Sequence, residues 1–188
     1  MNKLTNPPAC PFCNIAAHFP ASRKDGPESS SASSSSSFSS TSPAHIILST
    51  QHLLAFLDIM PLTRGHVLIT TRHHFEKLSD IDIEVSKEIG KWLPIVSRAV
   101  MITLFGEDEE QHHWNVVQNN GYRAAQQVPH LHFHVIPRPP LNSDQRLMPS
   151  FVMFGRGQRD ELDDEEGKTL AAAIREQMVR EVEGIDLE

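Results

Sequence analysis

The expected fold is decided by His130-Leu131-His132-Phe133-His134-Val135-Ile136, a stretch that alternates strictly between imidazole and apolar side chains. Successive side chains of a β-strand point to opposite faces of a sheet. The three histidines therefore share one face, and the apolar residues share the other, which can pack against a core. Imidazole attacks electrophiles, exchanges protons near neutral pH and binds metal ions, so this spacing predicts a functional site. Spacing alone leaves both a nucleophilic strand and a metal-binding strand open.

The whole chain has 188 residues and a formal net charge of −7. This length suits one domain with a real core and is too short for two ordinary domains with linkers. An acidic chain lacks the basic face that general nucleic-acid binding needs, so no nucleic-acid partner is expected. No apolar run approaches the ~20 residues that cross a bilayer, so no membrane partner is expected. Residues 1–8 lack the apolar region of a secretion signal, which favours a cytoplasmic protein, with the nucleus as a second compartment.

Apolar patterning along the rest of the chain predicts an α+β domain. A helix is expected to begin at Ser79 or Asp80, because both residue types cap helices and an apolar stripe follows. Pro94 is expected to kink or split this helix, and a second helix is expected over about 163–183. Strands with segregated helices indicate a five-stranded antiparallel sheet with one helix packed on it and a C-terminal helix. The expected strands are His45–Ser49, Leu53–Leu57, His66–Thr71, Trp114–Gln118 and His130–Pro137.

Composition divides the chain into four parts. Residues 29–42 are almost entirely serine, and such a segment cannot bury enough surface to offset its ordering entropy. We therefore expect residues 22–43 to be a disordered insertion. It separates an N-terminal segment with a Cys-x-x-Cys pair, residues 1–21, from the domain core, residues 44–140. A C-terminal extension, residues 141–188, contains the second helix.

Several motifs in a fixed order resemble the histidine-triad (HIT) family of nucleotide hydrolases and transferases, in its zinc-bearing form. The resemblance covers roughly residues 10–140 apart from the serine-rich insertion. Besides the histidine strand, it rests on Cys10-Pro11-Phe12-Cys13, Phe56-Leu57-Asp58-Ile59-Met60-Pro61, Gly65-His66-Val67-Leu68-Ile69, Asn119-Asn120-Gly121 and Gln126-Gln127-Val128-Pro129. It implies cleavage of an α-phosphorus bond of a purine nucleotide conjugate through a covalent nucleotidyl-histidine intermediate. It also implies a homodimer.

The resemblance implies roles for individual residues. His132 would be the nucleophile, His134 would donate to the phosphate oxygens, and Gln126 would supply a further catalytic donor. Asp58 would accept the ribose hydroxyls. The other nucleotide-binding residues that it implies are Phe12, Ile15, Phe56, Asn119 and Gln127, with His134 and Gln126 contacting the nucleotide as well.

Two positions depart from the family pattern. Ala125 stands where the family usually has glycine, which costs roughly 1 kcal/mol if the backbone there takes a positive φ. Gln127 stands where many members carry a serine or threonine that protonates the leaving group, and an amide cannot act as a general acid. Asn119 favours a phosphoramidate substrate, whereas Ile136-Pro137-Arg138 favours a dinucleoside polyphosphate, so the leaving group stays open.

The Cys10 and Cys13 pair predicts a metal or redox site in a chain without a secretion signal. The resemblance implies that His74 and His130 complete a structural zinc site in which the protein fills all four positions. The adjacent His73 is the alternative to His74 as a metal ligand.

Two other functions fit the same residues. In one, all three histidines of the strand hold a catalytic metal ion in a metal-dependent hydrolase. In the other, the domain binds nucleotides without turnover, which the departures at Ala125 and Gln127 favour.

Overall fold

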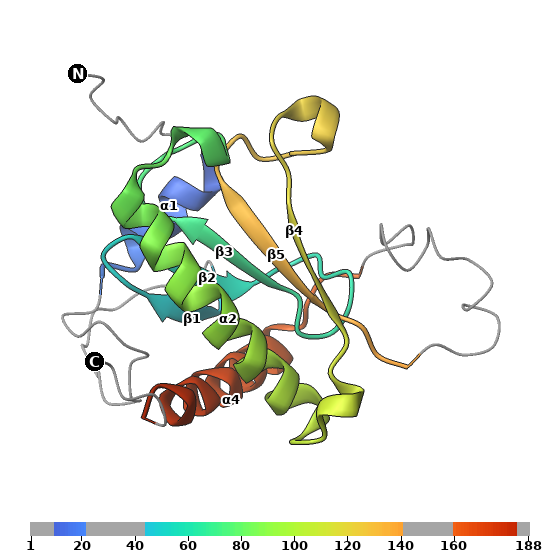
Figure 1. Cartoon of the computed structure of the whole chain (residues 1–188). Helices are drawn as coiled ribbons and strands as arrows, with labels where there is room; N and C mark the ends of the chain where they lie inside the picture. The colour runs from blue at the N-terminus through green and yellow to red at the C-terminus, as the bar shows by residue number, and fades with distance from the viewer. Residues whose placement is uncertain (1–9, 22–43, 141–159, 184–188) are drawn as a thin grey trace.

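The computed structural model describes residues 10–21, 44–140 and 160–183, so the serine-rich insertion lies outside the described residues. Five antiparallel strands form one sheet in the order β1-β2-β3-β5-β4 (Figure 1), which confirms the expected α+β fold. The strands are β1 (Ile46–Ser49), β2 (Leu53–Leu57), β3 (Val67–Thr71), β4 (Trp114–Gln118) and β5 (His132–Pro137). Each boundary lies within two residues of the expected one. The helices are α1 (Pro11–His18), α2 (Ile83–Phe105) and α4 (Asp164–Glu183), with 3-10 turns η1 (Leu78–Asp80), η2 (Glu109–Gln111) and η3 (Tyr122–Ala124).

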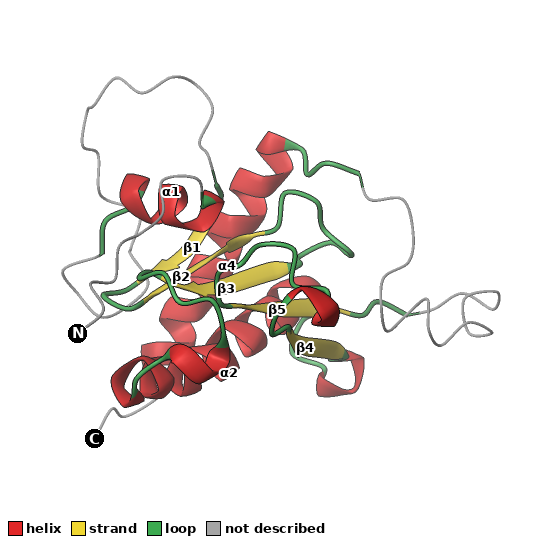
Figure 2. Ribbon diagram, turned by 90° about the horizontal axis from the view of Figure 1, so that it is seen from above, coloured by secondary structure: helices red, strands yellow, loops and turns green. Residues whose placement is uncertain are grey.

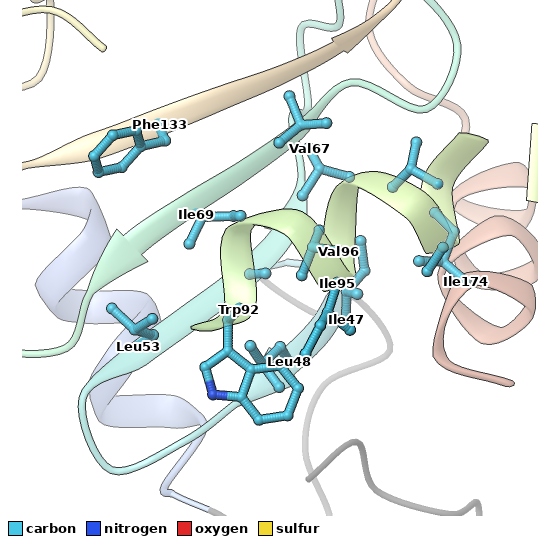
Figure 3. Close-up of a cluster of buried hydrophobic side chains, with 14 of the residues drawn as sticks. Ile47, Leu48, Leu53, Val67, Ile69, Trp92, Ile95, Val96, Phe133 and Ile174 are labelled. Atoms are coloured by element: carbon cyan, nitrogen blue, oxygen red, sulfur yellow. The ribbon is translucent and has the colours of Figure 1, made fainter. Parts of the chain in front are cut away.

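One face of the sheet packs against α2 and α4 and forms the main core (Figure 3). On this face the strands contribute Val67, Ile69 and Phe133, and α2 contributes Trp92 and Val96, all of them buried. Burial of one such side chain stabilises the fold by about 1.5–3 kcal/mol. The apolar residues of β5 are therefore fixed in this core, and its histidines must face the other side of the sheet.

The helix α2 begins later than its sequence suggests. Its N-cap is Asp82, whose Oδ1 accepts a hydrogen bond from the Val85 amide at 2.9 Å. The prediction of Ser79 or Asp80 as the cap is wrong, because Asp80 accepts from the Lys77 amide within the preceding 3-10 turn. A polar side chain one turn before a helix can thus hydrogen-bond within its own turn, and a later residue then caps the helix.

The helix α2 runs to Phe105, and α4 covers nearly the whole range predicted for the second helix. Pro94 was expected to kink or split the first of these helices, and α2 continues through it as one element, so the helix is not split. The helix α4 begins where expected, and Asp163 Oδ1 accepts from the amides of Glu165 and Glu166 at its first turn. None of the helices in the described ranges is long and apolar enough to span a membrane.

The strand β5 starts two residues after the expected position, at His132. Before it, the His130 amide donates to the Val128 carbonyl at 2.8 Å, and the Leu131 amide donates to the Phe75 carbonyl at 2.6 Å. His130 therefore belongs to a turn rather than to the strand. This change of backbone direction separates its ring from the rings of the two later histidines.

The helix α1 lies on the face of the sheet opposite α2 (Figure 2), where the ring of its Phe12 lies 5.7 Å from that of His130 and 5.1 Å from that of His132. The sequence did not predict α1 as a helix, although Pro11 at its first turn is typical of helix starts. Phe12 and Cys13 of this helix pack with Leu54, Phe56 and other residues in a second apolar cluster. The N-terminal segment is thereby joined to the sheet beside β5.

Arg72, directly after β3, connects α1 to the sheet through hydrogen bonds. Its guanidinium donates to the carbonyl oxygens of Ala16 at 3.0 Å, Phe19 at 2.8 Å and Thr50 at 2.9 Å, and to Oγ of Ser49 at 2.7 Å. Burial lowers the pKa of Arg72, and the carbonyl dipoles at the end of α1 offset the cost of burying its charge.

Replacing Arg72 by alanine should lower the free energy of unfolding by about 3 kcal/mol, because it leaves several partly buried carbonyl groups without donors. Chemical denaturation measures this change. Arg64→Ala is the matched control, because Arg64 pairs with Glu166 at an exposed position, and its loss should cost less than about 1 kcal/mol. Equal stability of the two variants would contradict the role assigned to Arg72.

Candidate active site and metal centre

Four side chains predicted as metal ligands converge between α1 and the sheet. Nδ1 of His130 lies 3.3 Å from Sγ of Cys10 and 3.6 Å from Sγ of Cys13. Nδ1 of His74 lies 3.4 Å from Sγ of Cys13. All four donor atoms lie within 4.8 Å of one another. His74 therefore belongs to this group, and the adjacent His73 does not.

The donor set fits a tetrahedral zinc ion. Zinc–sulfur and zinc–nitrogen bonds of about 2.3 and 2.0 Å place sulfur and nitrogen about 3.5 Å apart in a tetrahedral site, close to the distances found here. Nε2 of His130 donates to the Thr71 carbonyl at 2.8 Å, so its Nδ1 carries the lone pair that faces the thiols. Burial lowers the pKa of His130 to about 4, which keeps this ring neutral. Burial and the neighbouring Cys10 raise the pKa of Cys13 to about 12, a penalty on the thiolate that a bound cation reverses.

His132 is held in the tautomer that a nucleophile requires. Its Nδ1 lies 2.6 Å from the carbonyl oxygen of His130. Because a carbonyl only accepts, Nδ1 must carry the proton and Nε2 keeps its lone pair. Burial lowers the pKa of His132, against smaller opposing effects of that carbonyl and of Asp58. The ring is therefore neutral at pH 7 and available for attack.

A second line of side chains supports His134. Nδ1 of His134 lies 3.0 Å from Nε2 of His66, and Nδ1 of His66 accepts from the Leu62 amide at 3.1 Å. This order makes His66 Nε2 the donor to His134 and leaves His134 Nε2 as a donor. Oδ2 of Asp58 lies 3.3 Å from Nδ1 of His66. Asp58, the predicted ribose ligand, and His134, the predicted phosphate donor, are thus connected through the buried imidazole of His66.

His66 is the site residue that sequence reasoning missed. It appeared only within a motif of the resemblance, yet it is fully buried at the entry to β3. The signal was available, because His66, Leu68 and Thr70 alternate along β3, and Leu68 pairs with His134. Alternation therefore places His66 on the same face as the histidines of β5.

Gln126 lies just before β5, and its side-chain amide is hydrogen-bonded to the backbone. Oε1 accepts from the Gly121 amide at 2.5 Å, and Nε2 donates to the Glu76 carbonyl at 2.7 Å and lies 3.4 Å from the His130 carbonyl. This buried amide shapes the connection between β4 and β5. Its predicted role as a donor to the substrate stays a prediction, because phosphate contact would replace one of these bonds.

The other predicted nucleotide contacts fall into two groups. Asn119 and Gln127 lie on the same connection, and their side chains form no hydrogen bond with any described residue, which leaves both amides available to a ligand. Phe12 and Phe56 are buried and pack edge to face, with ring centroids 5.6 Å apart, and Ile15 packs against the same cluster. The ring of Phe12 also lies 5.1 Å from that of His132. The predicted base walls therefore adjoin the ring of His132.

Ala125 has φ +62°, and it is the one non-glycine residue of the described ranges with a positive φ. The left-handed conformation costs a residue with Cβ about 1–2 kcal/mol. The loop that precedes the histidines therefore keeps the conformation for which a glycine is suited, at a cost in stability.

The Ala125→Gly variant should be more stable than the natural chain by about 0.5–1 kcal/mol, because glycine relieves this strain while losing more entropy on folding. Ala124→Gly is the control, because Ala124 has an ordinary negative φ and the same exposure class. That substitution should destabilise the fold slightly. A destabilised Ala125→Gly protein in chemical denaturation would contradict the left-handed assignment.

The antiparallel sheet, the histidines on one face and the Cys–His group beside them define a histidine-triad type of domain. Residues 39–141 match the HIT domain family model, and the chain belongs to this family. It is 36% identical over 97 residues to an uncharacterised HIT-like protein of Methanocaldococcus jannaschii, a match covering 51% of this chain and 70% of that protein. It is 38% identical over 98 residues to adenosine 5'-monophosphoramidase HNT1 of Candida albicans, a match covering 51% of this chain and 62% of that enzyme, less than two thirds of its length.

The structural similarity to solved proteins extends beyond residues 39–141, the region that matches the family model. A Zn-bound histidine triad family protein from Mycobacterium smegmatis has a TM-score of 0.62 and 22% sequence identity, covering 94% of this chain and 98% of that chain. At this identity the likeness establishes a shared fold.

Proposed function

We propose that the protein is a nucleotide hydrolase or nucleotidyl transferase that cleaves the α-phosphorus bond of a purine nucleotide conjugate, either a dinucleoside polyphosphate or a nucleoside phosphoramidate. The observation that carries this proposal is the hydrogen bond between Nδ1 of His132 and the carbonyl oxygen of His130, whose heavy atoms lie 2.6 Å apart. It prepares a neutral imidazole whose Nε2 can attack phosphorus. The Candida relative, named for phosphoramidase activity, supports the same reaction class.

The proposed reaction has two steps. Nε2 of His132 forms a bond to the α-phosphorus, and the leaving group departs with the electron pair of the broken bond. Water then attacks the same phosphorus, breaks the phosphorus–nitrogen bond, and releases the nucleoside monophosphate and the free imidazole. His134, supported by His66, donates to the phosphate oxygens in both steps, which stabilises the charge that develops there.

Zinc is the proposed metal of the group formed by Cys10, Cys13, His74 and His130. Two thiolates and two imidazoles are the donors that a structural zinc ion takes. When bound, the ion would connect α1 to the turn that precedes the catalytic strand. The M. smegmatis neighbour, described as Zn-bound, shares the fold.

A metal-dependent hydrolase that uses all three histidines of the strand receives less support. His130 faces the cysteines, and Nδ1 of His132 is bonded to a carbonyl, so the three rings form no common ligand set among the described residues. A different group, Asp58, His66 and His134, does bring three potential ligand atoms within 4.8 Å of one another. Its internal hydrogen bond between imidazoles accounts for that proximity.

A homodimer formed through the edge strand β4 is the proposed assembly. Trp114 and Val116 of β4 are 41% and 44% exposed. They point to the face of the sheet that packs against α2, because Val116 pairs with the core residue Val135. Exposed apolar residues on an edge strand are typical of contacts between subunits. The proposed compartment is the cytoplasm, with the nucleus as the alternative, and the proposed small-molecule partner is a purine nucleotide.

The experiment that tests this function incubates the chain with diadenosine triphosphate and, separately, with adenosine 5'-phosphoramidate. Chromatography then measures the release of AMP. AMP formation from at least one substrate is expected. If neither substrate yields AMP while AMP itself binds, the non-catalytic nucleotide-binding module replaces the enzyme.

A further inference from the structure

Tyr122 is 92% exposed, the highest value among the large apolar side chains of the described residues. It lies on the 3-10 turn η3, and neither its side chain nor that of Arg123 forms a hydrogen bond or ion pair with any described residue. Tyrosine is enriched at binding interfaces, where its ring packs against a ligand and its hydroxyl stays in water.

The backbone before Tyr122 is connected to the nucleophile through one buried side chain. The amide of Gly121 donates to Oε1 of Gln126, whose Nε2 lies 3.4 Å from the carbonyl of His130. That carbonyl holds Nδ1 of His132. The turn that carries Tyr122 is therefore positioned by the same carbonyl that orients the attacking imidazole.

A second segment, residues 76–80, lies beside this turn. The Glu76 carbonyl accepts from Gln126, and the Leu78 amide donates to Oδ1 of Asn120 at 2.9 Å. Leu78 is 42% exposed. The two segments thus lie side by side, at the end of the sheet where β5 begins (Figure 1).

Lys77 adds a positive charge to this surface. Cε of Lys77 lies 3.8 Å from the position of a Cβ built on Gly121. The acid of the same turn, Asp80, already accepts from the Lys77 amide and the Ser79 hydroxyl. We call four of the exposed residues, Lys77, Leu78, Tyr122 and Arg123, the 77/122 rim; Glu76, Ser79 and Asp80 of the same segment are exposed as well.

The sheet order places the turn that carries Tyr122 and Arg123 across β5 from the proposed base walls. Phe56 belongs to β2, and β2 and β4 lie on opposite sides of β5 in the order β1-β2-β3-β5-β4. A nucleotide whose base contacts Phe12 and Phe56 and whose α-phosphorus lies at His132 would direct its leaving group toward the β4 side. Tyr122 and Arg123 follow β4 on that side, and Lys77 and Leu78, which follow β3, lie next to them.

We propose that the 77/122 rim binds the leaving group, and that the leaving group it fits is a second nucleoside joined through a polyphosphate. An exposed aromatic ring stacks on any nucleobase, and the cations of Lys77 and Arg123 offset phosphate charge in a chain of net charge −7. This inference rests on the proposed function. With diadenosine triphosphate, attack by His132 breaks the bond to the bridging oxygen, ADP leaves with the electron pair, and water releases AMP.

The test compares Tyr122→Ala with Tyr122→Phe on two substrates. For diadenosine triphosphate, kcat/KM of Tyr122→Ala should fall about 10-fold to 100-fold, mainly through KM, because a stacking contact is lost. Tyr122→Phe keeps the aromatic face and should stay near the natural chain. Adenosine 5'-phosphoramidate carries no second nucleoside, so its kcat/KM should be unchanged in both variants. Arg123→Ala should show the same selectivity, with a loss that shrinks as salt is added.

Two results would overturn this proposal. An equal loss with both substrates in Tyr122→Ala would show that the turn only supports the catalytic strand. An unchanged kcat/KM for diadenosine triphosphate would show that Tyr122 does not contact the leaving group, while the proposed function would stand. Absence of AMP release from both substrates by the natural chain would overturn the proposed function together with this inference.

Discussion

The His132→Asn variant is expected to lose turnover by about four to six orders of magnitude, the range found when a covalent nucleophile is removed. An asparagine amide can still donate to the carbonyl of His130, so the local hydrogen bond has a replacement. The amide nitrogen has no available lone pair, so no bond to phosphorus can form. Single-turnover measurement of AMP release, with whichever substrate the natural chain cleaves, gives the loss directly.

Two controls separate chemistry from folding in this experiment. His113→Ala removes an exposed histidine that belongs neither to the Cys–His group nor to the proposed catalytic histidines, so it should leave turnover unchanged. The affinity of His132→Asn for AMP should remain within about one order of magnitude, because the base walls and Asp58 are retained. Turnover of His132→Asn within tenfold of the natural chain would contradict nucleophilic catalysis by this residue.

The second large effect is expected on removal of the metal. The purified chain should contain one zinc ion, and chelation should lower its thermal unfolding midpoint by about 8–16 °C. A ligand present at about a thousand times its dissociation constant stabilises the native state by about 4 kcal/mol, and 1 kcal/mol shifts the midpoint of a chain of this size by about 2–4 °C. Calorimetry with and without chelator measures the shift, and elemental analysis measures the zinc.

Neighbouring histidines supply the matched control for the metal. His74→Ala should lower the zinc content and the midpoint, because Nδ1 of His74 lies 3.4 Å from Sγ of Cys13. His73→Ala should change neither, because His73 is exposed and outside the group. Equal zinc content in both variants, or a midpoint that chelation does not move, would contradict the structural zinc site.

Short-range patterns were sufficient to predict much of the fold. The alternation around His132 and Phe133 assigned a strand with one apolar face and one imidazole face, as the structure confirms. Alternation depends on backbone geometry alone, so it needs no knowledge of partners. It failed at His130, where the Leu131 amide bonds to the Phe75 carbonyl and the strand starts late. That bond joins residues far apart in sequence, which no local pattern reveals.

The supporting contacts of the site were not predictable for the same reason. His66 acts on His134 from another strand, Arg72 reaches the end of α1, and Gln126 spans two loops. Each of these residues has an ordinary local context. Their roles come from contacts between segments separated by many residues, and only the folded arrangement assigns them.

The central claim is covalent catalysis by His132, and the most direct measurement is mass spectrometry of the intact chain quenched after brief exposure to diadenosine triphosphate or adenosine 5'-phosphoramidate. The predicted result is an adduct of one AMP moiety that proteolysis maps to His132 and that is absent from His132→Asn. Release of AMP without any adduct at His132, or with the adduct on another residue, would contradict the claim.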